Sequence, residues 1–326
     1  MNDVPIPSLS SADDREVGYY GIPVIHASHW KWLVIWCFFF GGISGASALI
    51  AAVAHLAGGK EAARLAGAAT YVSFVALLPC PPLLILDLGR PLRFLNMLRA
   101  FRPSSPMSLG SWGLTAFGAI ATLATANQFT SDVGRSRGRT PSPIQRRAGL
   151  VLAPLAGISG VFLAGYTGTL LAATAVPLWA KRPTLLGPLF LASAVTSGTA
   201  AVTAAHALTA SGEESLTERL HHLEGIATIA EGALLTAWLV GLGPTRKPLI
   251  EGHIGAVVRH GIVGAGITAP LAITAASGKL PRRLGRLTNL IAPALTLCGV
   301  FALRYAVIEG GRLSANDPQA TFDITG

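Results

Sequence analysis

Eight apolar stretches of about 20 residues recur along the chain, and they constrain its fold more than any other feature. At the 1.5 Å rise of an α-helix, a stretch of about this length crosses the hydrocarbon core of a membrane. Only helices and closed barrels satisfy their backbone hydrogen bonds in lipid, and these stretches lack the alternation of a strand. The sequence therefore predicts an all-α integral membrane protein, a bundle of eight transmembrane helices.

The predicted spans are joined by short polar connections. They cover residues 32–57, 65–86, 109–129, 149–172, 185–208, 223–242, 254–276 and 287–308. Residues 1–31 are expected to form an N-terminal segment outside the bilayer, residues 32–308 a single membrane domain, and residues 309–326 a C-terminal tail. Runs of small residues predict close contact between helices, as at Gly41–Ala48 and Gly157–Gly160.

Composition supports a membrane protein and excludes several other classes. Only 13% of the residues are charged, against about 25% in a soluble domain. The net charge of +9 comes from basic residues in short loops, so we expect membrane lipid rather than nucleic acid as their partner. Cys37, Cys80 and Cys298 stand apart in the sequence and form no CxxC or CxxCH pattern. We therefore predict that this protein neither ligates an iron–sulfur cluster of its own nor attaches a c-type haem.

An even number of spans places both termini on one side of the membrane, here called the N-face. This side also holds the loop 87–108, whereas the loops 132–147, 211–224 and 279–286 lie on the opposite face. Lysine and arginine divide almost evenly between the two sides. If the arginines of loop 87–108 have functional roles, the remaining charges favour a cytoplasmic opposite face and extracytoplasmic termini.

Ionisable residues inside the spans predict a proton path from the opposite face. Glu231 lies well inside the sixth span, and Glu224 lies two helical turns before it on the same helix face. His206 ends the fifth span beneath a stripe of threonines, at the same side. The alternative is that Glu224, His206 and the similarly placed His55 are interfacial groups in water. A haem held between His55 and His206 is a weaker alternative.

Polar side chains also converge on the N-face from several predicted helices. Hydroxyl, imidazole, guanidinium and indole groups at the rim of an apolar bundle suit a flat apolar ligand with two polar oxygens, such as a quinone. The candidate quinone-binding residues are His29, Asp87, Arg90, Ser111, Trp112, Tyr166 and Arg304. The alternative is a belt of interfacial aromatic residues and arginines whose side chains extend to the membrane surface.

The segment DLGRPLRFLNMLRAFRPSSPMSLGSW, residues 87–112, carries more charge than a membrane turn requires. Charges at a rim steer association and fix the register of a bound partner. We assign Arg93, Arg99 and Arg102 as candidates for docking a partner subunit, beside the quinone candidates of the same segment.

Five motifs resemble the NrfD/PsrC-type membrane subunits of polysulfide reductase-like complexes. They are, in sequence order, YYGIPVIHASHWKW with the following FFFGGISGAS, the segment 87–112, GYTGTLLAATAVPLW, the glutamate at 231, and LRYAVIEGG. The resemblance extends over nearly the whole sequence. One departure is VVRHG at Val257–Gly261, where the family tends to be aromatic.

The resemblance implies a quinone-reactive or non-catalytic subunit of an oxidoreductase in a bacterial cell membrane, one that binds no metal itself. Such a subunit binds menaquinone or ubiquinone near the face where a four-cluster iron–sulfur, ferredoxin-like subunit docks. That subunit exchanges electrons with a molybdopterin-containing catalytic subunit. Two alternatives stay open: a purely structural anchor, and a secondary transporter with broken helices, which Pro79, Pro81 and Pro82 in the second span suggest.

Overall fold

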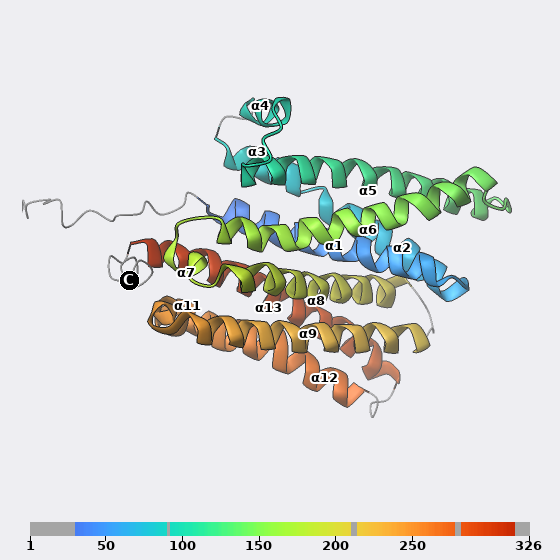
Figure 1. Cartoon of the computed structure of the whole chain (residues 1–326). Helices are drawn as coiled ribbons and strands as arrows, with labels where there is room; N and C mark the ends of the chain where they lie inside the picture. Colours follow the sequence, from blue (N-terminus) through green and yellow to red (C-terminus); the bar gives the residue numbers. More distant parts are fainter. Residues whose placement is uncertain (1–29, 90–91, 210–213, 278–281, 317–326) are drawn as a thin grey trace, which may run out of the picture.

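The protein folds into a bundle of long helices that run along one common axis (Figure 1). The structure, a computed structural model, describes residues 30–89, 92–209, 214–277 and 282–316. These residues form helices and turns and contain no strand. Eight helical segments are long and apolar enough to cross a membrane, which confirms the predicted eight-helix bundle.

The helical elements follow one another closely along the sequence. The α-helices are α1 (Trp32–Ala57), α2 (Lys60–Leu77), α3 (Cys80–Asp87), α4 (Arg93–Arg99), α5 (Pro106–Ser136), α6 (Pro143–Ala172), α7 (Pro177–Ala180), α8 (Pro183–Thr209), α9 (Glu214–Leu242), α10 (Lys247–Ile250), α11 (Gly252–Ala256), α12 (Ala269–Ser277) and α13 (Arg282–Ala315). A 3₁₀-helix at Gly243–Arg246 precedes α10, and a π-helix at Val257–Thr268 joins α11 to α12.

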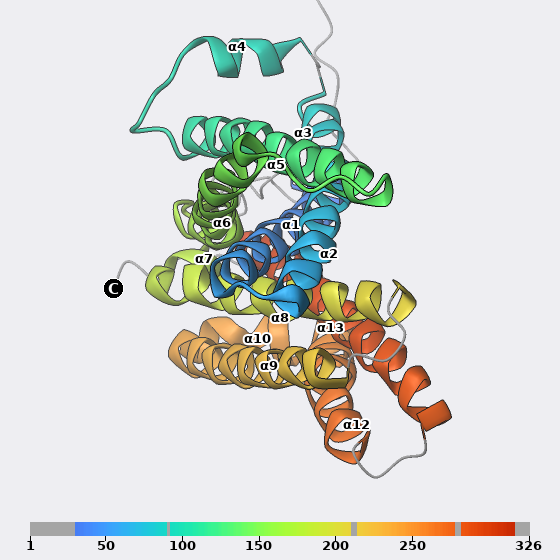
Figure 2. The same ribbon diagram turned by 90° about the vertical axis from the view of Figure 1, so that its right-hand side faces the viewer.

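Helices α1, α8 and α13 form the centre of the bundle. Their most apolar windows are 72%, 61% and 56% buried, whereas no other span exceeds 33%. Seen along the bundle, α5 and α6 lie on one side of this centre, and α9 and α12 lie on the other (Figure 2). The central helices therefore meet few lipids and can carry polar side chains at membrane depth.

The two ends of the bundle differ in structure. Helices α3, α4, α7 and α11 gather at the N-face, on the left of Figure 1. The connections from α1 to α2 and from α5 to α6 lie at the opposite face. In both views α4 stands outside the bundle. The N-face thus holds most of the short helices.

Small residues bring neighbouring helices into backbone contact, as predicted. A Cβ atom on Gly45 of α1 would overlap with the carbonyl oxygen of Gly160 on α6, and the reverse also holds. Gly266 and Gly299 make the same kind of contact between the π-helix and α13. Side chains at these positions would force the helices apart, so the glycines set the spacing.

The helices depart from the predicted spans in three places. The second span breaks after Leu77 and resumes at Cys80, because Pro79 and Pro81 lack the amide hydrogens that would continue the first helix. The seventh span contains a 12-residue π-helix that its sequence pattern did not predict. The eighth span continues to Ala315, beyond the predicted end at 308, because Gly311 fits under the buried Trp179 indole and Ser314 accepts a hydrogen bond from the Leu178 amide at 3.3 Å.

Candidate functional site

Tyr166 joins α6 to the start of α5 at the N-face. Its ring lies against Gly110, where a Cβ atom would have no room, and stacks on Phe162 with the ring centroids 5.2 Å apart. Its hydroxyl donates a hydrogen bond to the carbonyl oxygen of Pro106, the first residue of α5. The phenol is therefore held in one orientation beside the helix start.

Two further candidates share this turn of α5. Ser111 is buried, and its hydroxyl donates to the Met107 carbonyl at 2.8 Å. Trp112 is 38% exposed and meets the Phe101 ring edge-on, with centroids 5.9 Å apart. The fold thus brings Ser111, Trp112 and Tyr166 to the same part of the N-face.

A groove of about 310 Å³ lies between α4 and the start of α5. Its lining mixes apolar and polar side chains and includes one of the predicted docking arginines. The lining residues are Asn96, Met97, Ala100, Arg102, Ser105, Met107 and Ser108. The Ser108 hydroxyl accepts a hydrogen bond from the Arg102 amide at 3.0 Å, which holds the turn before α5. This groove adjoins the α5 turn that carries Pro106.

The remaining N-face candidates lie around this groove or outside the described residues. Asp87 is the half-buried last residue of α3. Arg99 at the end of α4 and Arg102 are exposed. Arg93 begins α4, but its side chain is not among those described, and His29 and Arg90 lie outside the described residues.

Arg304 occupies a different place from the other quinone candidates. It is fully buried in α13, and its Nη1 donates to the Ser193 hydroxyl of α8 at 2.6 Å. The guanidinium lies 5.4 Å from the Phe190 ring centroid, and Gly42 of α1 leaves room for Nη2. No described contact joins Arg304 to Tyr166. The arginine therefore lies in the bundle centre rather than at the N-face rim.

Glu231 lies near this buried arginine, and no ion pair or hydrogen bond between the two side chains is found among the described residues. It is 2% exposed in α9, and its carboxyl lies against the hydroxyls of Ser193 and Thr196 and near the Arg304 guanidinium. A charge removed from water is tolerated when an opposite charge and hydrogen bonds replace the water. The Nε and Nη2 atoms of Arg304 have no hydrogen-bond partner among the described residues.

A second group of polar side chains leads from Glu231 toward the opposite face. Glu224 is 5% exposed and accepts a hydrogen bond from the Thr296 hydroxyl of α13 at 2.9 Å. His221 lies 3.9 Å from the Glu224 carboxylate, and its other ring nitrogen is 3.0 Å from Asn289. Polar groups of α9 and α13 therefore follow one another inside the bundle.

Several polar residues around the two buried glutamates were missed by the sequence-based prediction. They are Ser193 beside Glu231, and His221, Asn289 and Thr296 around Glu224. Asn289 and Thr296 share one face of the last span, as Glu224 and Glu231 do in the sixth, and that matched spacing was the available signal. His206 is buried at the end of α8, and no described hydrogen bond joins it to Glu224.

Two cysteines predicted to stand alone lie together in the fold. The Cys37 thiol donates to the Cys80 carbonyl oxygen at 3.9 Å, and the Cys80 thiol donates to the Cys37 carbonyl oxygen at 3.7 Å. Both cysteines are free. Within the described ranges, no three His, Cys, Asp or Glu side chains are grouped so that they could hold a metal ion.

Comparison with known proteins agrees with this architecture. Residues 25–316 match the family described as Polysulphide reductase, NrfD. The sequence is also 26% identical over 304 residues to the C subunit of polysulfide reductase from Wolinella succinogenes, and the alignment spans 87% of this protein and 94% of that subunit. Because the family match extends over most of the sequence and all eight spans, this protein belongs to the NrfD family of polysulphide reductase proteins.

Proposed function

We propose that this protein is the quinone-reactive membrane subunit of a multi-subunit oxidoreductase. It passes electrons between a membrane quinone or quinol and an iron–sulfur partner subunit. Membership of the NrfD family supports a membrane anchor in a redox complex, and its relative is named as one subunit of a polysulfide reductase. The observation that carries the quinone proposal is the Tyr166 phenol, held beside Ser111 and Trp112 next to an N-face groove.

The chemistry of this region suits a quinone. The groove of about 310 Å³ has the volume of a small-molecule site, and its lining combines apolar and polar side chains. The candidates Ser111, Trp112 and Tyr166 lie beside the groove and are not part of its lining. The Tyr166 oxygen donates to Pro106 and keeps lone pairs that accept a hydrogen bond from a quinol hydroxyl. Asp87, Ser111 and Trp112, together with His29 and Arg90, complete the proposed set of quinone-binding residues.

The partner subunits are assigned to the same face. Arg99 and Arg102 are exposed beside the groove, so their charges are available to an acidic surface of a ferredoxin-like subunit, and Arg93 begins the same short helix. Such a subunit holds its own iron–sulfur clusters and exchanges electrons with a molybdopterin-containing catalytic subunit. An adjacent quinone site keeps the electron-transfer distance short.

The quinone site is tested by removing one hydroxyl. We expect Tyr166→Phe to lower quinol-linked turnover of the assembled complex by about tenfold or more, because a group that positions or exchanges a proton contributes on this scale. The matched control is Tyr71→Phe, which removes the hydroxyl that donates to Asp132 at 2.7 Å near the opposite face. Steady-state oxidation of a quinol analogue measures both. Unchanged turnover in Tyr166→Phe, with normal assembly, favours the purely structural anchor.

We also propose that the buried acids conduct protons from the opposite face to the quinone region. Glu224 and Glu231 lie two turns apart on α9 with the buried Thr228 between them, and His206 is a further candidate near the entrance. The unpartnered nitrogens of Arg304 are positions where water completes such a path. Arg304 is therefore reassigned from the quinone set to this path.

The proton path predicts a selective effect of Glu224→Gln. The amide keeps the size and the hydrogen bond with Thr296 but does not ionise, so proton uptake by the complex in sealed vesicles should slow by about tenfold. A pH-sensitive dye follows the uptake. The control is Glu251→Gln, an exposed acid at the N-face, which should change nothing. Equal rates in the two variants would remove Glu224 from the path.

A further inference from the structure

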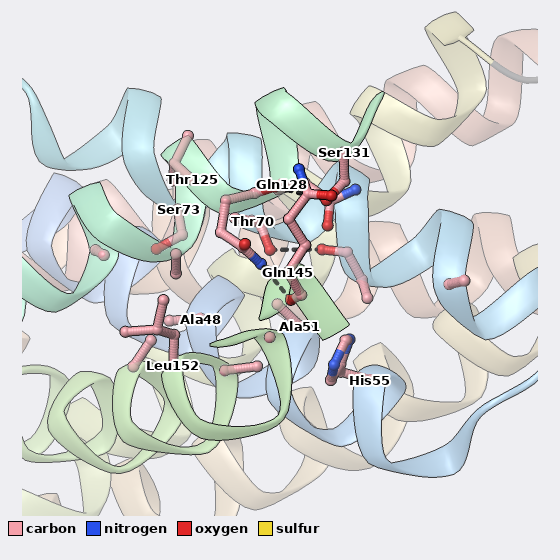
Figure 3. A pocket seen from close by; sticks show the side chains of 18 of the residues that line it. Ala48, Ala51, His55, Thr70, Ser73, Thr125, Gln128, Ser131, Gln145 and Leu152 are labelled. Carbon is pink, nitrogen blue, oxygen red and sulfur yellow. Dashed lines mark hydrogen bonds between the residues drawn. The ribbon is translucent and has the colours of Figure 1, made fainter. Parts of the chain in front are cut away.

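A second cavity lies at the opposite face, far from the proposed quinone site. It has a volume of about 190 Å³ and is enclosed by α1, α2, α5 and α6 (Figure 3). Its lining runs along α6 from Gln145 to Ala156, which corresponds to about 16 Å of helix. The cavity therefore reaches from the membrane surface into the hydrocarbon region.

The two ends of the cavity differ in chemistry. The inner end is lined by small apolar residues, among them Ala48, Ala121 and Ala156. The outer end carries the basic side chains His55, Arg135 and Arg146, and no carboxylate lines it. Arg135 is paired with Asp132, but Arg146 has no ion-pair partner among the described residues. The mouth therefore attracts an anion, and the interior accepts apolar groups.

An unsatisfied buried group shows that the interior accepts a polar atom as well. Thr125 is 9% exposed, lines the cavity, and its hydroxyl has no hydrogen-bond partner among the described residues. The hydroxyls of Thr70 and Ser73 also line the cavity, and both donate to backbone carbonyls, so that their oxygens can act as acceptors. Buried polar groups are normally satisfied, so a polar atom of a ligand or water belongs beside Thr125.

We propose that this cavity binds the headgroup of an anionic membrane phospholipid. Its phosphate is held at the mouth by Arg146 and His55, its glycerol oxygens reach the Thr125 hydroxyl, and the first methylenes of an acyl group lie against the alanines. A phospholipid and inorganic phosphate both carry a phosphate group that these basic side chains can bind. The apolar inner wall of the cavity favours the phospholipid over inorganic phosphate. The neighbouring loop adds Arg137 and Arg139, which raise the local concentration of anionic lipid.

Adjacent arginines provide a matched test. The full-length protein in a neutral detergent is titrated with phosphatidylglycerol, and thermal unfolding reports binding, since a ligand of the folded state raises the melting temperature. We expect Arg146→Gln to weaken the apparent affinity by about tenfold, as for loss of one charged hydrogen bond. Arg147→Gln removes the same charge one residue away, outside the cavity lining, and should bind as wild type. Equal weakening in both variants would reduce the effect to general surface attraction and overturn the proposal.

A second pair of variants fills the space without changing charge. Ala124 lines the cavity, whereas Ala126 is exposed on the same helix and does not. Ala124→Leu should abolish the stabilisation by phosphatidylglycerol, and Ala126→Leu should retain it. Inorganic phosphate is titrated in parallel and should not stabilise the wild-type protein. Stabilisation by phosphate alone to the same extent, or unchanged lipid binding in Ala124→Leu, would overturn the assignment of a lipid.

Discussion

Gly45→Ala is expected to lower the free energy of unfolding by about 3 kcal/mol or more and to reduce the yield of folded protein. The added methyl group meets the carbonyl oxygen of Gly160, which is backbone and cannot rotate away. Helices α1 and α6 must separate to relieve this overlap, and overpacking of a well-packed interior is costly. Recovery by detergent gel filtration and denaturation with a titrated anionic detergent measure the two effects.

The control is Gly41→Ala in the same helix. Gly41 is also buried, but the nearest atom to an added Cβ is the Cys80 sulfur at 3.9 Å, which is ordinary van der Waals contact. Because alanine favours a helix over glycine, this variant should be unchanged or stabilised by up to about 1 kcal/mol. If the two variants lose stability equally, the close crossing of α1 and α6 does not depend on the absence of a side chain at Gly45.

Arg304→Met is expected to lower the free energy of unfolding by about 3–5 kcal/mol. It removes the positive charge near Glu231 and leaves that carboxyl at membrane depth beside neutral groups, among them the hydroxyls of Ser193 and Thr196. The double variant Arg304→Met with Glu231→Gln removes both charges and should recover a large part of this loss. The difference between the double variant and the sum of the single ones measures the coupling of the pair.

Arg312→Met is the matched control in the same helix. Arg312 also forms an ion pair, with Glu309 at 2.7 Å, but the two side chains are 32% and 25% exposed. A pair in contact with water contributes only about 0–1 kcal/mol, so this variant should change little. Additive losses in the Arg304 and Glu231 variants would show that the two residues act independently.

The number and approximate bounds of the spans could be predicted because each reflects a local requirement. Residues 32–57 form α1 as predicted, since an apolar run of this length has one stable conformation in lipid. The loop at residues 137–142, which separates α5 from α6, could be predicted for the same reason, because turn signals are equally local. The π-helix at Val257–Thr268 was not predicted from its own residues; it lies where Gly266 closely approaches Gly299 of α13, a contact that no local sequence signal records.

The residues of the candidate site also differ in how far the sequence could predict them. An isolated glutamate in an apolar span predicted a functional position at Glu231 without any knowledge of its neighbours. The sequence also placed Tyr166 and Arg304 on one face, because it records depth along a helix but not the direction in which a side chain points. The fold separates them: Tyr166 meets α5 and Arg304 meets α8.

The sequence by itself determined that this protein crosses the membrane eight times and carries polar residues at depths where contact with lipid would be unfavourable. Length, hydropathy and backbone hydrogen bonding suffice for that conclusion, since they act within each span. Only the tertiary structure decided that Arg304 lies near Glu231, that Thr296 contacts Glu224, and that a basic cavity opens at the opposite face. Those relations depend on how each helix is rotated about its axis, and rotation is set by packing between helices distant in the sequence.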